Sequence, residues 1–434
     1  MRFKDFKNTF LFTIIFGFIV VVISCAGKVR NEEAEARNAK LEDSGTNSIN
    51  EKAIIVGANR TEIYLPILQG KRVGLVANQT SVIFADNEEV RETTEDEKNY
   101  THLVDSLLSQ NINIKKVFAP EHGFRGTADA GELVKDGKDT KTGLPILSLH
   151  GKHKKPEPDA LEDLDIMVFD IQDVGVRFYT YISTLHYVME ACAENDIPLL
   201  ILDRPNPNGS YIDGPILEKE HSSFLGMHTI PLVHGMTIGE YAQMINGEKW
   251  LANGVVCDIT IVNMENYNHD SQYHLPIRPS PNLPNDLSIL LYPSLGLFEG
   301  TNINAGRGTE FQFQRYGAPF LDKSECNFTY TPVANFGSKY PKHQNELCYG
   351  VDLSTVSMER HFTLKYIIDA YKHAIDKAKV FNTKNFTTHA GTAKLQQQIE
   401  AGLSESEIRA TWQTGLQNYN AMRKKYLLYN LKEE

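Results

Sequence analysis

The sequence is poor in cysteine and carries no excess of positive charge. Five cysteines in 434 residues are too few for a small scaffold held together by a dense set of disulfides. The 44 lysines and arginines are outnumbered by 55 aspartates and glutamates, giving a formal net charge of −11. Nucleic acid is therefore not an expected partner, because the basic surface that neutralises phosphate backbones is missing. An anionic small substrate stays compatible, since a few arginines in a cleft can outweigh distant negative charge.

The usual signatures of cofactor and hydrolase chemistry are also missing. No Gly-x-Gly-x-x-Gly follows the first expected strand, and there is no Gly-x-x-x-x-Gly-Lys-Ser/Thr loop, so we expect neither a dinucleotide nor any other cofactor. Gly-x-Ser-x-Gly, Ser-x-x-Lys and His-Glu-x-x-His are absent as well. Their absence argues against α/β-hydrolases, penicillin-recognising enzymes and zincins.

One long apolar run lies near the N-terminus, from Phe10 to Ile23, behind the basic residues Arg2, Lys4 and Lys7. This order is typical of a secretory signal, and the run is short for a membrane helix. The run ends in VISCA at residues 22–26, which resembles a bacterial lipobox and predicts lipidation of Cys25. Residues 1–25 are then a lipoprotein signal peptide, with a signal anchor holding a buried cysteine as the alternative.

The predicted lipid at Cys25 would tie the chain to a membrane. Residues 26–52 contain few large apolar side chains, which predicts a flexible tether. These features together predict a lipoprotein of the bacterial cell envelope, on the periplasmic side or in the outer membrane.

From residue 53 onwards, β-branched runs alternate with amphipathic helical stretches, which predicts an α/β fold with a mostly parallel sheet. Helices are expected at 101–110, 179–194 and from a Thr237-x-x-Glu240 capping box onwards. Strands are expected at residues 72–77, 116–119, 145–149, 165–170, 198–203 and 258–262.

A proline-rich segment, residues 274–284, is the expected domain junction. We predict a Rossmann-like catalytic domain over 53–280 and a smaller C-terminal α/β domain over 281–434. Two late helices are expected in that smaller domain, at 361–379 and 405–429. A disulfide between Cys326 and Cys348 and free buried thiols are equally compatible with the cysteine spacing.

The polar residues that follow the expected strands indicate where chemistry takes place, because ligands of open parallel sheets bind beyond the carboxyl ends of the strands. Four loops there bring Glu, His, Asp and Arg toward one cleft. Such an inventory suits cleavage of a glycosidic bond, in which a carboxylic acid protonates the leaving oxygen. The loops begin at Asn78, Pro120, Gln172 and Arg204.

Several long motifs in the same order resemble the exo-acting β-N-acetylmuramidases, bacterial glycoside hydrolases formerly known only as a domain of unknown function. The resemblance runs from about Ile54 to the C-terminus. The motifs are GLVANQTS at 74–81, FAPEHGFRG at 118–126, FDIQDVGVRFYTY at 169–181, LDRPNP at 202–207, HGMT at 234–237, PSPN at 279–282 and FEGT at 298–301.

The resemblance implies removal of N-acetylmuramic acid from the non-reducing end of peptidoglycan fragments. Muropeptides or disaccharides from peptidoglycan would be the partners. It also implies a Rossmann-like domain joined to a smaller C-terminal domain, with the active site between them.

Glu121 is our candidate for the general acid, because partial burial in a Pro-Glu-His-Gly turn at a strand end favours a proton donor. The alternative is that Glu121 only caps the turn. His122 is a candidate for orienting Glu121 or binding sugar hydroxyls. Asp173 is the first choice for the second catalytic carboxylate and Glu132 the second, while Asp170 is expected to be structural. Attack by the substrate's own 2-acetamido oxygen is a further mechanism that stays open.

The lactyl carboxylate that distinguishes N-acetylmuramic acid suits a planar guanidinium. The candidates for this contact are Arg125, Arg177, Arg204 and Arg307. The alternative for each is pairing with a neighbouring Asp or closing an interdomain salt bridge. Arg307 lies in a Gly-Arg-Gly loop expected to reach back over the cleft. Further candidates for sugar contacts are Asn78, Gln79, Asn206 and His234, with Tyr179 as a stacking residue and Tyr181 more typical of the core.

Two other functions stay open on the sequence alone. A lipid-tethered protein that only captures muropeptides would use the same polar loops without turnover. A metal-dependent hydrolase would need a site built from Glu121, His122, Asp129, Glu132 and Asp173.

Overall fold

The β-branched runs form the strands of a seven-stranded sheet with the order β5-β6-β4-β1-β7-β8-β9. In this computed structural model the described residues are 52–85, 99–126 and 136–431, and those from residue 53 onwards belong to one compact unit. All neighbours in the sheet pair in parallel except β5 with β6. The strands are β1 (Arg72–Ala77), β4 (Asn113–Ala119), β5 (Gly137–Lys138), β6 (Pro145–Ser148), β7 (Ile166–Asp170), β8 (Leu199–Leu202) and β9 (Ile259–Val262).

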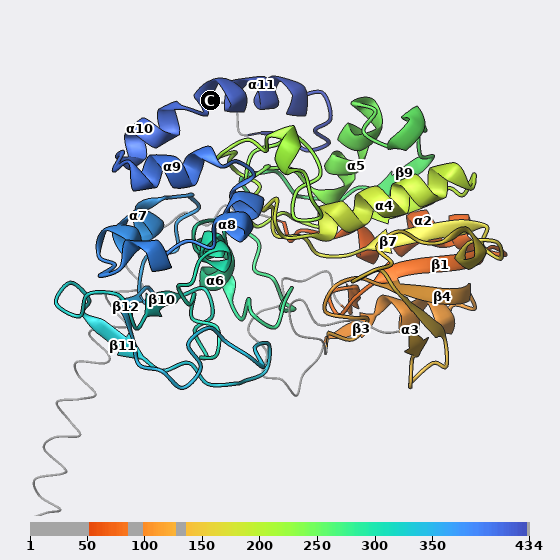
Figure 1. Cartoon of the computed structure of the whole chain (residues 1–434). Coiled ribbons are helices and arrows are strands. Elements are labelled where there is room, and N and C mark those ends of the chain that lie inside the picture. Colours follow the sequence, from red (N-terminus) through yellow and green to blue (C-terminus); the bar gives the residue numbers. More distant parts are fainter. Residues whose placement is uncertain (1–51, 86–98, 127–135, 432–434) are drawn as a thin grey trace, which may run out of the picture. The chain divides into compact units, whose positions relative to one another are not determined.

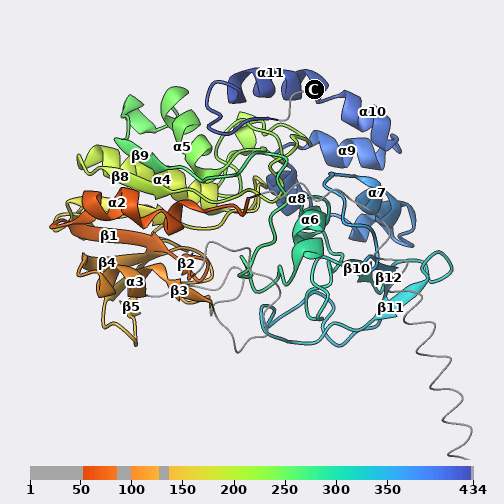
Figure 2. The same ribbon diagram turned by 180° about the vertical axis from the view of Figure 1, so that it is seen from behind.

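Helices cover both faces of this sheet, so its central strands are buried on both sides and are almost continuously apolar. On one face lie α4 (Tyr181–Glu194) and α5 (Ile238–Gly247), and on the other α2 (Thr61–Leu68) and α3 (Leu103–Ser109) (Figures 1 and 2). Successive strand residues alternate between the two faces. Val76, Phe118 and Phe169 belong to the core under α4 and α5, whereas Leu75, Val117 and Val168 belong to the core over α2 and α3.

The chain continues from the sheet into a region with a smaller sheet and six helices among the described residues. Antiparallel strands in the order β10-β12-β11 form that sheet. A separate antiparallel pair, β2 (Val82–Phe84) with β3 (Tyr100–His102), lies earlier in the chain. The strands are β10 (Arg315–Ala318), β11 (Phe328–Tyr330) and β12 (Cys348–Asp352). The helices are α6 (Asp286–Leu295), α7 (Lys365–Lys372), α8 (Thr383–Ala390), α9 (Lys394–Glu400), α10 (Glu405–Ala410) and α11 (Gln413–Arg423).

The predicted fold class, a mostly parallel sheet domain followed by a smaller C-terminal region, is confirmed. One hydrophobic core cluster includes residues of both regions, such as Phe169 and Phe386. The proline-rich segment 274–284 contains no helix or strand, as its prolines require. The boundary between residues 280 and 281 stays a prediction.

The single late helices predicted at 361–379 and 405–429 are wrong. α7 ends at Lys372 because the chain turns there and Ala374 pairs with Leu321 across a β-bridge. The second segment is divided into α10 and α11 at Trp412, whose indole is buried in the core. Cys192, Cys257, Cys326 and Cys348 are free thiols, so the alternative of a Cys326–Cys348 disulfide is not what the structure shows.

The end of the described chain is anchored against the first sheet. One carboxylate oxygen of Glu240 accepts hydrogen bonds from the amides of Leu428 (2.9 Å) and Tyr429 (3.3 Å) and lies 2.9 Å from His269 Nε2. The Tyr429 hydroxyl donates to Asp203 Oδ2 at 2.8 Å. These buried polar groups satisfy one another, as removal from water requires.

None of the described helices is both long and apolar enough to cross a membrane.

Candidate active site

The site lies at the point where the chain reverses direction across the large sheet. From β1 the chain proceeds outward to β4 and β6, then returns to form β7 on the other side of β1. In doubly wound sheets this reversal point is where ligands bind, beyond the carboxyl ends of the strands. Asn78 Nδ2 donates to Tyr181 Oη (2.9 Å), and Tyr181 Oη donates to the Glu121 carbonyl (3.3 Å). The loops after β1, β4 and β7 thus meet, as the sequence predicted.

A pocket opens at this meeting point and takes side chains from both regions of the protein. From the large-sheet region it is lined by Glu121, His122, Phe178, Tyr179, Thr180, Tyr181 and Leu225. From the rest of the chain it is lined by Ser280, Asn282, Leu283, Tyr292, Glu299, Arg307, Phe313 and His389. Aromatic rings, two carboxylates and one arginine on the same wall are suited to a sugar with an anionic substituent.

Glu121 and His122 form the centre of a strained turn after β4. The Gly123 amide donates to the Pro120 carbonyl at 3.0 Å, which closes the turn. His122 has φ of 70°, a left-handed conformation that is uncommon for residues other than glycine. Thr180 Oγ1 donates to Glu121 Oε2 at 3.1 Å and fixes one carboxylate oxygen. Backbone strain of this kind concentrates at functional sites, where it sets the direction of a side chain.

Glu299 is a second carboxylate of the pocket, and its surroundings are cationic. Arg307 Nη1 donates to Glu299 Oε2 at 2.8 Å, and Lys342 Nζ donates to the Glu299 carbonyl at 3.2 Å. Burial opposes ionisation of this carboxyl, but the charges of Arg307 and Lys342 outweigh burial and lower the pKa of Glu299. Glu299 is therefore ionised at neutral pH.

Tyrosines form the aromatic part of the wall. Tyr179 Oη donates to the Pro279 carbonyl at 2.7 Å, and its ring packs edge-on against Tyr181 and Tyr292 at centroid distances of 4.8 and 5.9 Å. Burial raises the pKa of Tyr179 and of Tyr292 well above the ordinary value. Both phenols stay neutral in the working range of an enzyme.

Two family models match the chain, one for the N-terminal part of the exo-β-N-acetylmuramidase NamZ over residues 73–287 and one for its C-terminal part over residues 290–429. The chain belongs to the exo-β-N-acetylmuramidase NamZ family. The peptidoglycan β-N-acetylmuramidase NamZ of Bacillus subtilis is 40% identical over 386 residues, covering 84% of this chain and 89% of the relative.

Two crystal structures of DUF1343 family proteins from Bacteroides fragilis are similar to this structure. One has a TM-score of 0.77 at 44% identity and covers 87% of this chain and 99% of the other. The second has a TM-score of 0.72 at 28% identity and covers 87% of this chain and 100% of the other. The predicted membership of the exo-β-N-acetylmuramidases, and with it a glycoside hydrolase, is confirmed.

In this NamZ family member, three of the four candidate arginines lie away from the pocket wall and are engaged elsewhere. Arg125 pairs with Asp139, with Nη2 and Oδ2 2.7 Å apart. Arg204 is buried against Asp170, with Nε and Oδ1 2.6 Å apart. Arg177 is fully buried and donates to backbone carbonyls. The structure thus favours the alternative of structural pairing for Arg125 and Arg204 and brings Arg307 alone of the four into the pocket wall.

Asp173 is buried beside the pocket and does not line it. Its Oδ2 accepts a hydrogen bond from the Gly175 amide at 2.7 Å and lies 3.5 Å from Nε2 of the equally buried His234. The second carboxylate that lines the pocket is therefore Glu299, whereas Asp173 was the first choice for this role. Glu299 belongs to the FEGT motif but was not among the predicted site residues, because the sequence does not show its pairing with Arg307.

The amide side chains predicted to contact the sugar hold loops together instead. Asn78 Oδ1 accepts from the Thr80 amide at 2.8 Å, and Gln79 Nε2 donates to the Pro279 carbonyl at 3.1 Å. Asn206 Nδ2 donates to the Met236 carbonyl at 2.9 Å. None of these three amides lines the pocket.

Three predicted residues, Cys25, Asp129 and Glu132, lie outside the described residues.

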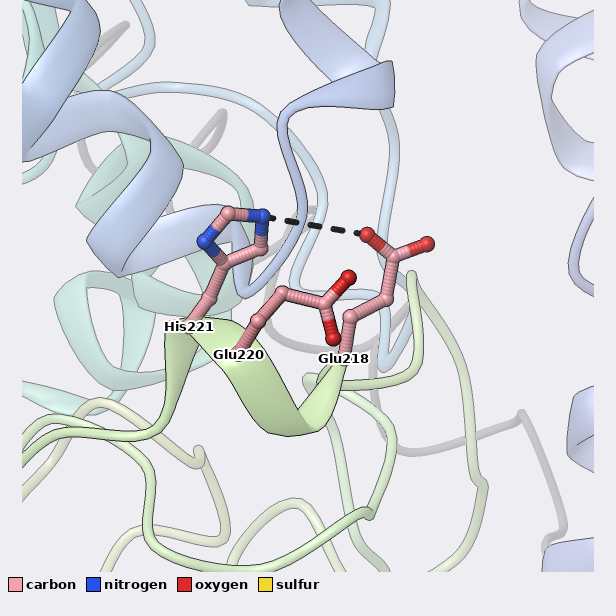
Figure 3. Close-up of side chains that lie close together, drawn as sticks. All are labelled: Glu218, Glu220 and His221. Carbon is pink, nitrogen blue, oxygen red and sulfur yellow. Dashed lines mark ion pairs between the residues drawn. The ribbon is translucent and has the colours of Figure 1, made fainter.

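One group in the described part of the chain has acidic and histidine ligand atoms close enough to share a metal ion, namely Glu218, Glu220 and His221 (Figure 3). It lies away from the pocket. The Glu218 carboxylate accepts from Thr392 Oγ1 at 2.9 Å and forms an ion pair with Lys394. Burial opposes ionisation of Glu218, but Lys394, together with the Thr392 hydroxyl and His221, outweighs burial and lowers the pKa of this carboxyl. A cation would have to displace Lys394, so we assign no metal to this group.

Proposed function

We propose that the protein is an exo-acting β-N-acetylmuramidase that removes N-acetylmuramic acid from the non-reducing end of peptidoglycan fragments. Its NamZ family membership supports this proposal. The observation that carries it is a pocket with two carboxylates in different environments, Glu121 on a strained turn and Glu299 beside two cations. Pairs of carboxyl groups with different surroundings divide acid and base roles in glycosidases.

Glu121 is the general acid in this proposal. It gives its proton to the glycosidic oxygen as the bond to the anomeric carbon breaks, and the leaving sugar departs as an alcohol. A water molecule then adds to the anomeric carbon and returns a proton to the Glu121 carboxylate. The ionised Glu299 stabilises positive charge on the sugar during this exchange. Participation by the 2-acetamido oxygen is compatible with the same acid.

Arg307 supports recognition of the lactyl carboxylate. Arg307, which lines the pocket, and Lys342, which lies behind Glu299, together carry one more positive charge than Glu299 neutralises, and this favours a bound anion. The planar guanidinium of Arg307 lines the pocket and is suited to a carboxylate, whereas N-acetylglucosamine offers none.

The test compares the full chain with its Glu121→Gln variant on chromogenic β-N-acetylmuraminide and β-N-acetylglucosaminide. We expect release from the muraminide and a fall of about 100-fold or more in turnover in the variant, with little change in substrate affinity. Glu62→Gln is the control, because this glutamate is 67% exposed on α2. Tight muropeptide binding without release by the wild type would instead identify a capture protein.

We also propose that the protein is a lipoprotein of the bacterial cell envelope, attached through Cys25. The basic start, the apolar run and the lipobox-like VISCA segment support this location. Metabolic labelling with a radioactive fatty acid should mark the wild type and not Cys25→Ser. Equal labelling of both chains, or its absence from both, would contradict the proposal.

A further inference from the structure

His389 lies in the pocket wall and comes from the far end of the sequence. It is the penultimate residue of α8, and its ring lies 5.7 Å from that of Phe178. Glu299 and Arg307 are in the same wall. No sequence motif pointed to this histidine, because α8 was not among the expected helices.

The hydrogen bond of one ring nitrogen determines what the other nitrogen can do. His389 Nδ1 lies 2.8 Å from the Asn385 carbonyl oxygen. A carbonyl only accepts, so Nδ1 carries a proton. When the ring is neutral, Nε2 therefore has a free lone pair and is an acceptor.

The surroundings of His389 keep the ring neutral. Burial lowers the pKa of this histidine, and the positive charges of Lys342 and Arg177 lower it further. The bond to Asn385 and the charge of Glu299 act in the opposite direction and are outweighed. At neutral pH the His389 ring is therefore an uncharged hydrogen-bond acceptor in the same pocket as the donor Arg307.

Arg177 fixes the end of the helix that carries His389. Its Nη1 donates to the carbonyls of Pro215 and Ile230, both at 2.8 Å. Its Nη2 donates to the carbonyls of His389 (3.3 Å) and Ala390 (2.6 Å) at the C-terminus of α8. A cation at this end of a helix is favourable, and here it comes from the motif that follows β7.

The turn that ends α8 is shaped around this guanidinium. Gly391 has a left-handed φ of 76°, and a Cβ atom at that position would lie 2.6 Å from Arg177 Nη2. A side chain at this position therefore displaces either the guanidinium or the helix end.

We propose that His389 accepts a hydrogen bond from a hydroxyl of the bound sugar through Nε2, and that Arg177 is a positioning residue that holds His389 in the pocket. The inference rests on the proposed function, since it assigns two more residues to the same site. It differs from the earlier expectation for Arg177, which placed its guanidinium on the lactyl carboxylate.

Kinetics of the full chain test the role of His389. His389→Phe keeps the ring shape and removes the acceptor, so we expect KM for the muraminide to rise by about 2- to 12-fold with kcat less affected. His389→Gln restores an acceptor and should recover part of the loss. The control is His361→Phe, since the His361 side chain is 51% exposed. An unchanged KM in His389→Phe overturns the assignment.

A spectroscopic measurement separates this inference from the proposed function. In the full chain with ¹⁵N-labelled histidines, the signals lost in His389→Gln identify the ring, which should be protonated at Nδ1. Added N-acetylmuramic acid should shift its Nε2 resonance. If the wild type releases neither chromogenic sugar, the proposed function fails, yet a shifted Nε2 still supports the contact. An Nε2 signal that does not move at saturating sugar overturns it.

A comparison of single and double variants tests the role of Arg177. Arg177→Lys cannot reach four carbonyls and should raise KM in the same way as His389→Phe, while the double variant should be no worse than His389→Phe alone. If Arg177→Lys does not fold, Gly391→Ala disturbs the same contact from the helix side. Independent, additive effects on KM overturn the positioning role.

Discussion

Asp203 gives a test of the buried polar cluster through the dependence of stability on pH. The carboxylate is fully buried and accepts hydrogen bonds from Thr237 Oγ1, the Gly239 amide and Tyr429 Oη. Burial raises the pKa of Asp203 from its ordinary value of 3.8 to about 6, with the charge of Glu240 acting in the same direction and the hydrogen bonds opposing it. The native state therefore holds this proton over a pH range in which the unfolded chain has lost it.

The sign and size of the effect follow from that difference in pKa. Stability contributed by Asp203 is fully present below the unfolded pKa and is lost as pH rises through about 6. The whole difference corresponds to about 3 kcal/mol, of which about 2 kcal/mol is lost between pH 4 and pH 7. Asp203→Asn keeps an acceptor oxygen and cannot ionise, so it removes this dependence.

Urea unfolding at a series of pH values measures the effect. We expect the free energy of unfolding of the wild type, minus that of Asp203→Asn, to fall by about 2 kcal/mol from pH 4 to pH 7. Asp159→Asn is a matched control at an exposed position and should follow the wild type throughout. A difference between wild type and Asp203→Asn that is constant over this range, or that grows with pH, would refute the reasoning.

Three further outcomes are expected. Asp170→Asn should lower the free energy of unfolding by about 3–5 kcal/mol, because it leaves Arg204 buried without a counterion. The double variant Asp170→Leu with Arg204→Met removes both charges and should cost less. Equal losses in the two variants would contradict this. Gly175→Ala should lower the melting temperature, because Gly175 has a left-handed φ of 77° and an added Cβ would lie 2.2 Å from Asn206 Oδ1. An unchanged melting temperature would disprove this steric argument. Muraminidase activity should survive chelation with EDTA, since the proposed acid–base scheme uses no ion; activity lost to EDTA and restored by Mn²⁺ or Mg²⁺ would replace that scheme.

Local patterns predicted the large sheet well because its signals are short-range. β1 was expected at residues 72–77 and is found at Arg72–Ala77, since a buried parallel strand is a continuous apolar run. The capping box at Thr237 and Glu240 is present, because both of its hydrogen bonds lie within one turn. The ends of the strands then located the loop with Glu121.

The C-terminal region and half of the pocket could not be predicted in the same way. Trp412 divides a helical stretch because tertiary packing buries its ring, which overrides local helix preference. Glu299, in the short 3₁₀ helix Gly296–Gly300, pairs with Arg307 of the loop that follows, and His389 joins them in the pocket from a helix about 80 residues further along. Arg177 follows β7 as an active-site residue would, yet its partners are carbonyls that sequence cannot reveal.

The anchoring of Tyr429 to Asp203 has a consequence for synthesis of the protein. The large sheet is encoded by residues 72–262, but Asp203 after β8 and Glu240 on the covering helix α5 obtain part of their hydrogen-bond donors from residues 428 and 429. The full set of hydrogen bonds to these two acids therefore forms only after residues 428 and 429 have been synthesised. A stop codon before residue 428 would remove these donors from two buried acids, so even a late nonsense mutation should destabilise the region around α5.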